Sequence, residues 1–325
     1  MFTFMAKVSV IIPIFKVESY IERCARSLFE QTLDDMEFVF VNDCTPDKSM
    51  EILKKVIEEY PSRKPQVKIL YNEKNKGLTT TRNTGLAAAT GEFIAHCDSD
   101  DWVAPMMYET LYQKAIDDKA DVVYCDINMI HKHTEEIYKS AQWDEDKTKL
   151  LQNYISTPWT CLVLVMAKRT LYEEHNLHSP SHINYCEDFW LTTRIFHYAK
   201  KVCYVPNAFY NYNRTNEQSI VHSLNKKTEK EEQIAYLETI SFFENEDAME
   251  HYQRQMSWRI LKSKQEMVLD AERHKKFMTI YPESHKYIWD CPYINGKLKI
   301  MMWLLTHNLR LILLPIIYLR KQIGH

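Results

Sequence analysis

Short apolar runs and amphipathic segments alternate along the first part of the chain. Five runs rich in β-branched and aromatic residues predict buried strands, at residues 8–12, 37–42, 67–71, 93–97 and 121–126. Between them, apolar residues recur three and four positions apart and predict helices, at residues 20–31, 48–60, 78–89 and 106–119. Regular alternation of strand and helix is typical of right-handed βαβ units. The predicted fold class is α/β, a Rossmann-like, mostly parallel sheet with helices on both faces.

The pattern changes after residue 127. Residues 131–149 are polar and irregular, which predicts a loop or an insertion. Further elements are predicted as a strand over 159–166, a short helix over 168–176, a helix ending near Tyr198 and a strand over 202–205. Beyond them the chain is charged and mostly helical in pattern. We therefore expect a catalytic domain over residues 1–222 and a helical C-terminal region over residues 223–325.

Polar residues follow the predicted parallel strands at the point where each strand ends. They occupy positions 13–15, 42–43, 72–73 and 98–101. Because the carboxyl ends of parallel strands share one edge of a sheet, these loops are expected to converge on a ligand pocket. The first strand is not followed by Gly-x-Gly-x-x-Gly, and the chain has no Gly-x-x-x-x-Gly-Lys-Ser/Thr loop. These absences disfavour dinucleotide-binding and P-loop proteins.

Three carboxylates, Asp98, Asp100 and Asp101, stand directly after the fourth predicted strand. Carboxylates this close repel one another, so a positively charged partner is expected there. Oxygen ligands of this kind suit Mg²⁺ or Mn²⁺, which keep part of their coordination shell for substrate phosphates. A solvated turn or the N-terminal cap of the next helix is the alternative, since Asp suits both positions.

The composition limits the class of protein further. A hydrophobic content of 45% and a charged content of 26% are ordinary for a globular protein. The net charge of −3 gives no reason to expect a nucleic-acid partner. The 8 cysteines are scattered, and residues 1–7 are too short and too uncharged for a secretory signal. Reduced thiols and a cytoplasmic location are therefore expected.

Five motifs occur in an order that resembles the inverting, metal-dependent glycosyltransferases of family 2, which have the GT-A fold. They are Val-Ile-Ile-Pro13-Ile-Phe15, Phe-Val-Asn42-Asp43, the Asn75-Lys-Gly77 to Arg82-Asn83-Thr-Gly85 segment, Asp98-Ser-Asp100-Asp101-Trp102, and Glu187-Asp188. The resemblance covers the predicted catalytic domain. It implies transfer of a sugar from a nucleotide-diphosphate donor with the help of Mn²⁺ or Mg²⁺.

The resemblance implies specific roles for the carboxylates. Asp100 is the principal expected ligand of the cation, and Asp98 contacts the ribose or the water shell of the metal. Asp101 is expected either near the donor sugar or among the residues that support the site from behind, although the helix-cap alternative fits it best of the three. Asp188 is the expected general base that takes the proton of the acceptor hydroxyl. An Asp at the start of a helix can also be only an N-cap.

Other positions are assigned to the donor and the acceptor by the same resemblance. The base and ribose are expected to contact Pro13, Phe15 and Asp43. Arg82 is expected to reach the base or the diphosphate, with a surface arginine as the alternative. A Tyr-x-Tyr-x-Arg…Ser pattern contains Tyr210, Tyr212, Arg214 and Ser219. Arg214 is a second expected contact of the diphosphate, and the tyrosines are predicted to pack in the core. Trp102 and Glu187 are expected to contact the acceptor, with half-buried packing as the alternative for Trp102.

The last part of the chain, residues 298–323, is apolar with interspersed basic residues. Its uninterrupted apolar run, residues 311–319, is too short to span a bilayer. One interpretation is a basic amphipathic helix lying in a membrane interface. The other is a helix pair that packs on the second domain or in a dimer, and the pattern does not decide between them.

The predicted activity is transfer of a single sugar, from a donor that is UDP-linked, to a hydroxyl of a glycan or lipid-linked acceptor. Cell-surface polysaccharide biosynthesis at the inner face of the membrane would fit such an enzyme. A sugar-1-phosphate nucleotidyltransferase is one alternative, but its Gly-rich first loop with a Lys is missing here. An inactive sugar-nucleotide-binding relative is another, and it would be expected to have lost the carboxylates. No motif in residues 127–230 indicates which sugar or acceptor is used.

Overall fold

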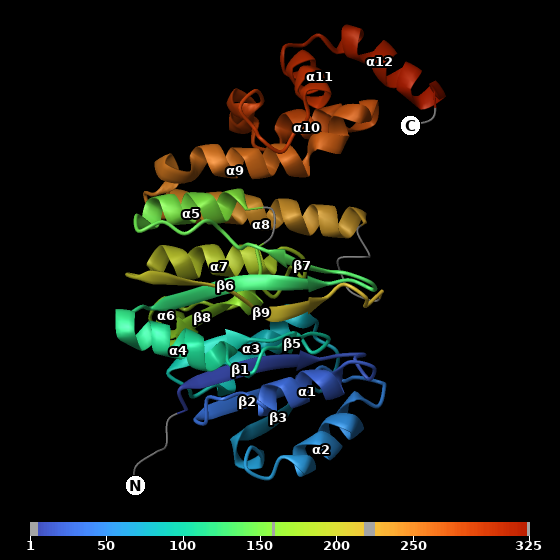
Figure 1. Cartoon of the computed structure of the whole chain (residues 1–325). Helices are drawn as coiled ribbons and strands as arrows, with labels where there is room; N and C mark the ends of the chain where they lie inside the picture. Colours follow the sequence, from blue (N-terminus) through green and yellow to red (C-terminus); the bar gives the residue numbers. More distant parts are fainter. Residues whose placement is uncertain (1–5, 158–159, 218–224, 324–325) are drawn as a thin grey trace. The chain divides into compact units, whose positions relative to one another are not determined.

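The computed structural model of the chain describes residues 6–157, 160–217 and 225–323 (Figure 1). The chain divides into two compact units, Met1–Leu224 and Asn225–His325. The first unit contains the sheet, and the second is helical.

The described strands of the first unit form one nine-stranded sheet. They are β1 (Val8–Ile14), β2 (Met36–Asn42), β3 (Val67–Tyr71), β4 (Phe93–His96), β5 (Trp102–Val103), β6 (Val122–Ile130), β7 (Glu135–Tyr138), β8 (Val165–Lys168) and β9 (Val202–Asn213). Their order is β3-β2-β1-β4-β8-β6-β9-β5, with β7 paired to β6. Strands β1–β4, β6 and β9 run in one direction, while β5, β7 and β8 run in the other.

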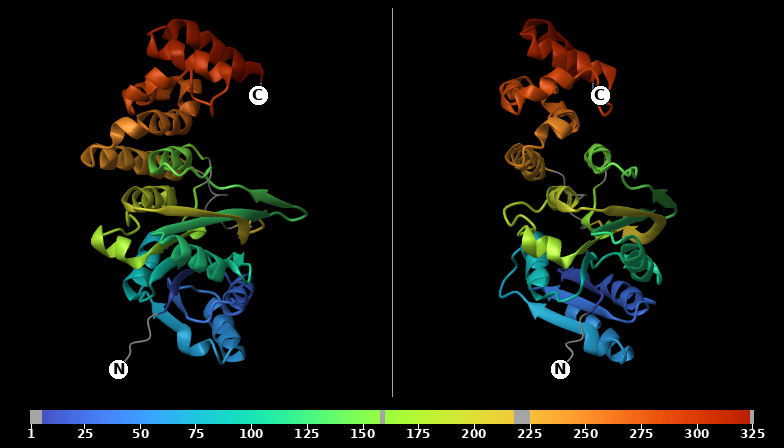
Figure 2. Two further views of the ribbon diagram at one scale, coloured as in Figure 1. Left: turned by 60° about the vertical axis from the view of Figure 1, so that its left-hand side comes forward. Right: turned by 90° about the vertical axis from the view of Figure 1, so that its left-hand side faces the viewer.

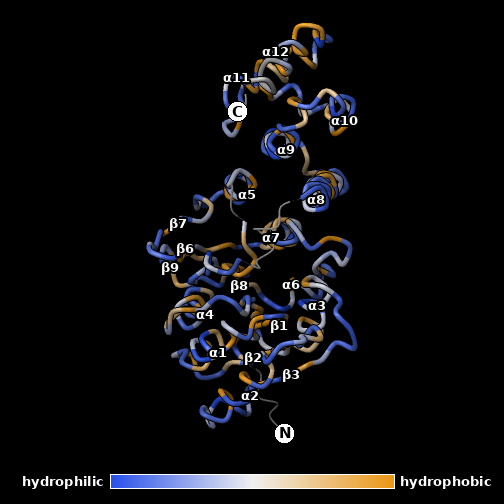
Figure 3. The backbone as a smooth tube through the Cα atoms, turned by 90° about the vertical axis from the view of Figure 1, so that its right-hand side faces the viewer, coloured by the Kyte–Doolittle hydropathy of each residue, from blue (hydrophilic) through white to orange (hydrophobic). Residues whose placement is uncertain are grey.

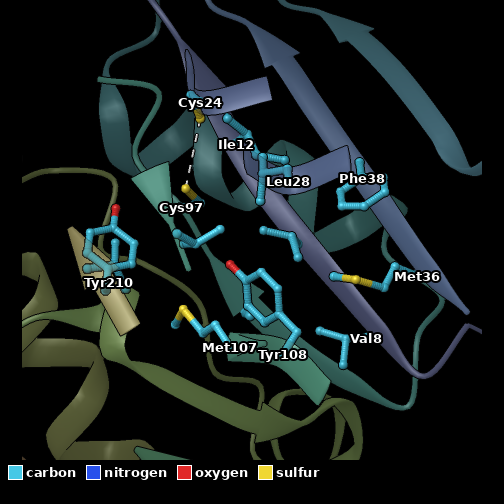
Figure 4. Close-up of a cluster of buried hydrophobic side chains, with 14 of the residues drawn as sticks. Val8, Ile12, Cys24, Leu28, Met36, Phe38, Cys97, Met107, Tyr108 and Tyr210 are labelled. Carbon is cyan, nitrogen blue, oxygen red and sulfur yellow. Dashed lines mark hydrogen bonds between the residues drawn. The ribbon is translucent and has the colours of Figure 1, made fainter. Parts of the chain in front are cut away.

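Helices cover both faces of this sheet (Figures 1 and 2). Those of the first unit are α1 (Ile21–Phe29), α2 (Ser49–Glu59), α3 (Leu78–Ala88), α4 (Met107–Asp118), α5 (Lys147–Ser156), α6 (Arg169–Glu174) and α7 (Glu187–Tyr198). Side chains alternate between the faces along a strand. Val8 and Ile12 of β1 therefore share a core with Leu28 of α1 and Tyr108 of α4 (Figure 4).

Helix α3 packs on the opposite face, against β1 and β2. Its close approach depends on Gly85. A Cβ atom at this position would lie 2.5 Å from Cγ2 of Ile11 and 3.2 Å from Cγ2 of Val41. The absence of a side chain at Gly85 therefore allows the close contact between this helix and the two strands.

The regions after residue 127 differ from the prediction in three places. Residues 131–149 are not an irregular insertion, because β7 pairs with β6 and Asp146 caps α5 by accepting from the backbone N–H groups of Thr148 and Lys149. The strand predicted over 202–205 extends as β9 to Asn213, with a register shift against β6 beside Asp126. The strand predicted over 159–166 begins outside the described residues, and its described part is a 3₁₀ turn, η2 (Leu162–Leu164), followed by β8.

The second unit consists of helices joined by short 3₁₀ turns. Its α-helices are α8 (Lys226–Asn245), α9 (Met249–Ser263), α10 (His274–Thr279), α11 (Gly296–Thr306) and α12 (Arg310–Ile323). Helices α11 and α12 contain long apolar stretches (Figure 3). Met302, Leu313 and Ile317 pack with Phe277 in an apolar core of this unit. Within the described part of the chain, no helix is long and apolar enough to cross a membrane.

Replacing Gly85 by alanine is expected to destabilise the first unit. The added methyl group meets Ile11 at 2.5 Å, and overpacking of a core costs about 1–3 kcal/mol. The measurement is the free energy of unfolding in urea. Gly296→Ala is the control, because a Cβ there meets nothing within 4 Å, and we expect no loss of stability. Equal stability of Gly85→Ala and the wild type would contradict the packing argument.

Candidate active site

The three carboxylates predicted at the end of the fourth strand lie in the loop between β4 and β5. The hydroxyl of Ser99 donates to the carbonyl oxygen of Pro13 at 2.6 Å, which ties this loop to the carboxyl end of β1. The hydroxyl of Tyr210, on β9, accepts from the backbone N–H of Asp98 at 3.0 Å. The strand ends therefore converge here, as the parallel alternation predicted.

Asp101 is fully buried, and both of its carboxylate oxygens have partners. One accepts from the hydroxyl of Tyr210 and the other from the backbone N–H of Asn213, each at 2.7 Å. Helix α4 starts at Met107, and no side chain caps it. The helix-cap alternative is therefore wrong for these carboxylates. Contact between Asp101 and a donor sugar stays a prediction.

Among the described residues, Asp100 has a polar partner but no cationic side chain in contact. Its Oδ2 accepts from the side-chain amide of Asn216 at 2.8 Å. Burial raises the pKa of Asp100, and the negative charge of Asp98 raises it further. Burial also holds the pKa of Asp101 well above its usual range, and Asp100 and Asp98 add to the effect. The loop therefore carries more negative charge than its surroundings balance.

This charge suits a divalent cation, but the protein supplies few ligands for one. Among the described residues, no group of three or more His, Cys, Asp or Glu side chains is arranged to hold a metal ion. A hard cation bound through one or two carboxylates completes its shell with water and substrate phosphates. Asp100 and Asp98 fit that kind of site.

Arg82 on α3 lies at the centre of the candidate site and is only 1% exposed. Its Nη2 contacts Asp98 at 2.8 Å, and its Nη1 contacts both Glu187 and Asp188 at 2.9 Å. The surface-arginine alternative is therefore wrong. The guanidinium links the loop that carries Asp98 to the start of α7. Its contact with a nucleotide stays a prediction.

Helix α7 presents Glu187 and Asp188 in its first turn. Cys186, just before it, has φ +64°, an uncommon conformation for a residue with a side chain. No side chain caps the helix, so the interpretation of Asp188 as only an N-cap is wrong. Burial and the charge of Asp188 raise the pKa of Glu187 to about 8, against the opposing effect of Arg82. Burial also raises the pKa of Asp188, which suits a group that accepts a proton.

His96, the last residue of β4, is a buried group that the sequence analysis did not identify. Neither ring nitrogen has a hydrogen-bond partner among the described residues. Burial and the neighbouring charge of Arg82 hold the pKa of His96 well below its usual range. The neutral form of the ring is therefore favoured, and it adds no positive charge beside Arg82.

Asp43, at the end of β2, fixes the loop that leads into α3. Its Oδ1 accepts from the side-chain amide of Asn72 and from the backbone N–H of Lys76, both at 2.8 Å. Its Oδ2 accepts from the backbone N–H of Gly77 at 3.0 Å, where φ is +83°. A carboxylate has about four acceptor positions, so one stays available for a base.

The remaining predicted contacts surround this centre. Pro13 is buried in β1, and Phe15, just beyond it, is exposed. Trp102 is half-buried under the guanidinium of Arg23, which lies 3.4 Å from the centre of its ring. Arg214 follows β9, and its guanidinium lies 5.9 Å from the ring of Tyr212. Ser219, the last residue of that pattern, lies outside the described residues.

Several residues of the site had no motif to indicate them. Asn213 and Asn216 hold the carboxylate loop, and Arg23 stacks on Trp102. Tyr210 is buried in the core, as predicted, but its hydroxyl also binds Asp101. The only sequence signal near the asparagines was the Tyr-x-Tyr-x-Arg pattern in which Asn213 lies.

Comparison with known proteins identifies the family. The profile of Glycosyl transferase family 2 matches residues 9–175. The chain belongs to glycosyl transferase family 2. A putative glycosyltransferase of Bacillus subtilis, EpsH, is 31% identical over 258 residues, which are 77% of this chain and 72% of the relative. EpsJ, an uncharacterized glycosyltransferase of the same bacterium, is 32% identical over 223 residues, 66% of this chain and 62% of the relative.

Solved structures confirm the predicted fold. TarS from S. aureus, crystallised as residues 1–349 with UDP, superposes with a TM-score of 0.69 and 18% identity, over 98% of this chain and 92% of that chain. The chain is therefore a family-2 glycosyltransferase with the GT-A fold, as the five motifs predicted. It spans less than two thirds of some relatives, such as 62% of EpsJ.

The buried pair Glu187 and Asp188 is expected to make stability depend on pH in metal-free protein. Because the pKa of Glu187 is raised to about 8, the folded state holds a proton that the unfolded state releases at lower pH. The free energy of unfolding should therefore fall as pH rises from about 5 to 8, by at most about 1.4 kcal/mol per unit for one proton.

Urea unfolding with a chelator at several pH values measures this effect. Glu187→Gln should flatten the profile in this range, whereas Glu174→Gln, at an exposed position of α6, should leave it unchanged. A profile that rises with pH in the wild type would show that Glu187 is ionised throughout.

Proposed function

We propose that this glycosyltransferase transfers a single sugar from a UDP-linked donor to a hydroxyl of a glycan or glycolipid, with inversion at the anomeric carbon. The supporting observation is the placement of Asp98 and Asp188 on the same buried guanidinium, that of Arg82, at 2.8 and 2.9 Å. A donor-binding carboxylate and a candidate base are thereby held at a fixed separation. Cell-surface polysaccharide biosynthesis is the proposed setting.

The donor would occupy the carboxyl edge of β1, β2 and β4. TarS, which shares the fold with a TM-score of 0.70, was crystallised with UDP-GlcNAc. In this chain Pro13, Phe15 and Asp43 would contact the base and ribose. Asp100 and Asp98 would hold Mn²⁺ or Mg²⁺, which neutralises charge on the leaving diphosphate. A structural neighbour with a TM-score of 0.57, a mannosyltransferase from Pyrobaculum calidifontis, was solved with GDP-Man and Mn²⁺.

Other residues of the chain would complete the donor and acceptor sites. Arg214, at the end of β9, would make a second contact to the diphosphate, and Asp101 would lie near the sugar while it anchors β9. Glu187 and Trp102 would contact the acceptor. The family match favours glycosyl transfer over the nucleotidyltransferase alternative.

Asp188 would act as the general base. Direct displacement with inversion requires one carboxylate to take the proton of the attacking hydroxyl as the bond to the anomeric carbon forms. Asp188 is in the first turn of α7, and its ion pair with Arg82 fixes its position. The rise in its pKa makes it a better proton acceptor than an exposed Asp.

The end of the second unit would contact a membrane surface. In α12, Leu313 and Ile317 pack inside the unit, whereas Leu311, Ile312 and Tyr318 are 85%, 54% and 63% exposed. Packing within the unit therefore explains the face of α12 that carries Leu313 and Ile317. It does not explain the exposed apolar side chains. A peripheral contact at the cytoplasmic face of the membrane would place the enzyme near lipid-linked acceptors.

Nucleotide release from a panel of sugar nucleotides, with Mn²⁺ and with a chelator, tests the activity. The wild type should release UDP from one donor only with the metal. Asp100→Ala should abolish this dependence together with turnover, and Asp188→Asn should lower the rate about 10²–10⁴-fold. Asp117→Asn, at an exposed position of α4, is the control.

The outcomes of this experiment separate the alternatives. Metal-dependent UDP binding without turnover of any donor would support an inactive relative or a missing acceptor, which addition of glycan acceptors then distinguishes. Turnover that depends on neither the metal nor Asp100 would refute the proposed site.

Sedimentation with vesicles that contain anionic lipid tests the membrane contact. The combined change Leu311→Ser and Ile312→Ser should lower binding about tenfold or more, because each exposed side chain contributes about 1.5–3 kcal/mol when buried in lipid. Ile116→Ser, at an exposed apolar position of the first unit, is the control. Equal vesicle binding by the double variant would exclude this face.

A further inference from the structure

Arg23 is a cation at the edge of the candidate active site that no motif assigned. It lies in the first turn of α1, the helix that follows β1. Its guanidinium lies 3.4 Å from the centre of the Trp102 ring, which comes directly after the carboxylates in the sequence. Stacking of this kind fixes the plane of the guanidinium while it leaves the N–H groups free to donate.

The N–H groups of Arg23 have no acceptor among the residues that the structure describes. Within the described residues, Arg23 makes no hydrogen bond or ion pair, although it is exposed. Arg26, one turn later on α1, is paired with both Glu22 and Glu59. Arg82 faces three carboxylates. Arg23 therefore differs from these arginines. Its guanidinium is held in place by the ring of Trp102 and contacts no carboxylate among the described residues.

The carboxylates of Asp100 and Asp101 have hydrogen-bond partners other than Arg23. Asp101 accepts from Tyr210 and Asn213, and Asp100 accepts from Asn216. Burial against the protein lowers the pKa of Arg23, and the charges of Asp101 and Asp100 offset this effect only in part. The guanidinium thus stands beside the expected diphosphate position with its N–H groups available.

We propose that Arg23, held on the ring of Trp102, binds a phosphate group of a substrate of this enzyme. A planar guanidinium can donate two parallel hydrogen bonds to phosphate oxygens. This inference rests on the proposed function, since it takes the Asp100 loop as the diphosphate site. The phosphate belongs either to the leaving diphosphate of the donor or to the acceptor. In both cases one face of the Trp102 ring supports the guanidinium of Arg23.

The donor arm of the test is calorimetric titration with UDP and with uridine, in the presence of Mn²⁺. If Arg23 contacts the diphosphate, Arg23→Gln should weaken UDP binding about tenfold or more and leave uridine binding unchanged. Arg23→Lys should recover only part of the loss, because the planar fork is absent. Arg26→Gln, on the same helix but with carboxylate partners, is the control and should bind UDP like the wild type.

The acceptor arm is titration with inorganic phosphate and with glycerol 3-phosphate, both without nucleotide and with UDP bound. If Arg23 contacts an acceptor phosphate, the wild type binds these probes with UDP present and Arg23→Gln does not. Trp102→Leu should weaken the same binding in whichever arm responds, because the guanidinium loses its support.

Two failures are distinguishable. Unchanged binding in both arms for Arg23→Gln, with metal-dependent UDP binding intact, overturns the role of Arg23 and leaves the proposed function standing. A wild type that binds no UDP with Mn²⁺ contradicts the proposed function instead. In that case the phosphate titration without nucleotide decides whether Arg23 binds an anion.

Discussion

The arrangement of the candidate site depends on the buried charge of Arg82. A guanidinium that is 1% exposed is stable only with anionic partners, and Asp98 and Asp188 supply them at 2.8 and 2.9 Å. Glu187, whose pKa is raised to about 8, accepts a further hydrogen bond from Arg82 at 2.9 Å. Removing those partners would leave an uncompensated cation, and removing Arg82 would leave the carboxylates to repel one another. The site nevertheless has excess negative charge, because Asp100 and Asp101 lie in the same loop. A bound cation would relieve this excess.

The sheet provides the geometry for this charge cluster. Strand β4 delivers Asp98 beside β1, while α3 lies close enough on the opposite face for Arg82 to reach it, since Gly85 leaves room against Ile11. Asp43 holds the loop before α3 through the backbone of Gly77. Changes at these positions would therefore shift the guanidinium of Arg82.

The sequence predicted the part of the fold that follows from local patterns. Apolar periodicity located β1 to β4 and the helices between them, and polar strand ends indicated the edge at which Asp98 and Asp43 lie. The prediction failed where pairing is not local. Strand β7 is polar and its side chains are mostly exposed, so only its partner β6 identifies it as a strand. Burial of Tyr210 was predictable from its apolar ring, but its hydrogen bond to Asp101 joins residues 109 positions apart. No local pattern records such a contact.

The two arginines of the site, Arg82 and Arg23, differ in the contacts that their guanidinium groups already make. The two Nη atoms of Arg82 contact three carboxyl groups, whereas its buried Nε has no hydrogen-bond partner among the described residues. A nucleotide could take the Nη donors only in place of contacts that also position Asp188. Arg23 has no carboxylate contact among the described residues. Its guanidinium is already held on the ring of Trp102, which reduces the conformational entropy lost when it binds an anion. Binding of a substrate phosphate would therefore replace fewer existing contacts at Arg23 than at Arg82. The existing contacts of the two side chains, more than their distance from the carboxylates, therefore favour different roles. Arg82 is a positioning residue for the base, and Arg23 is a substrate contact.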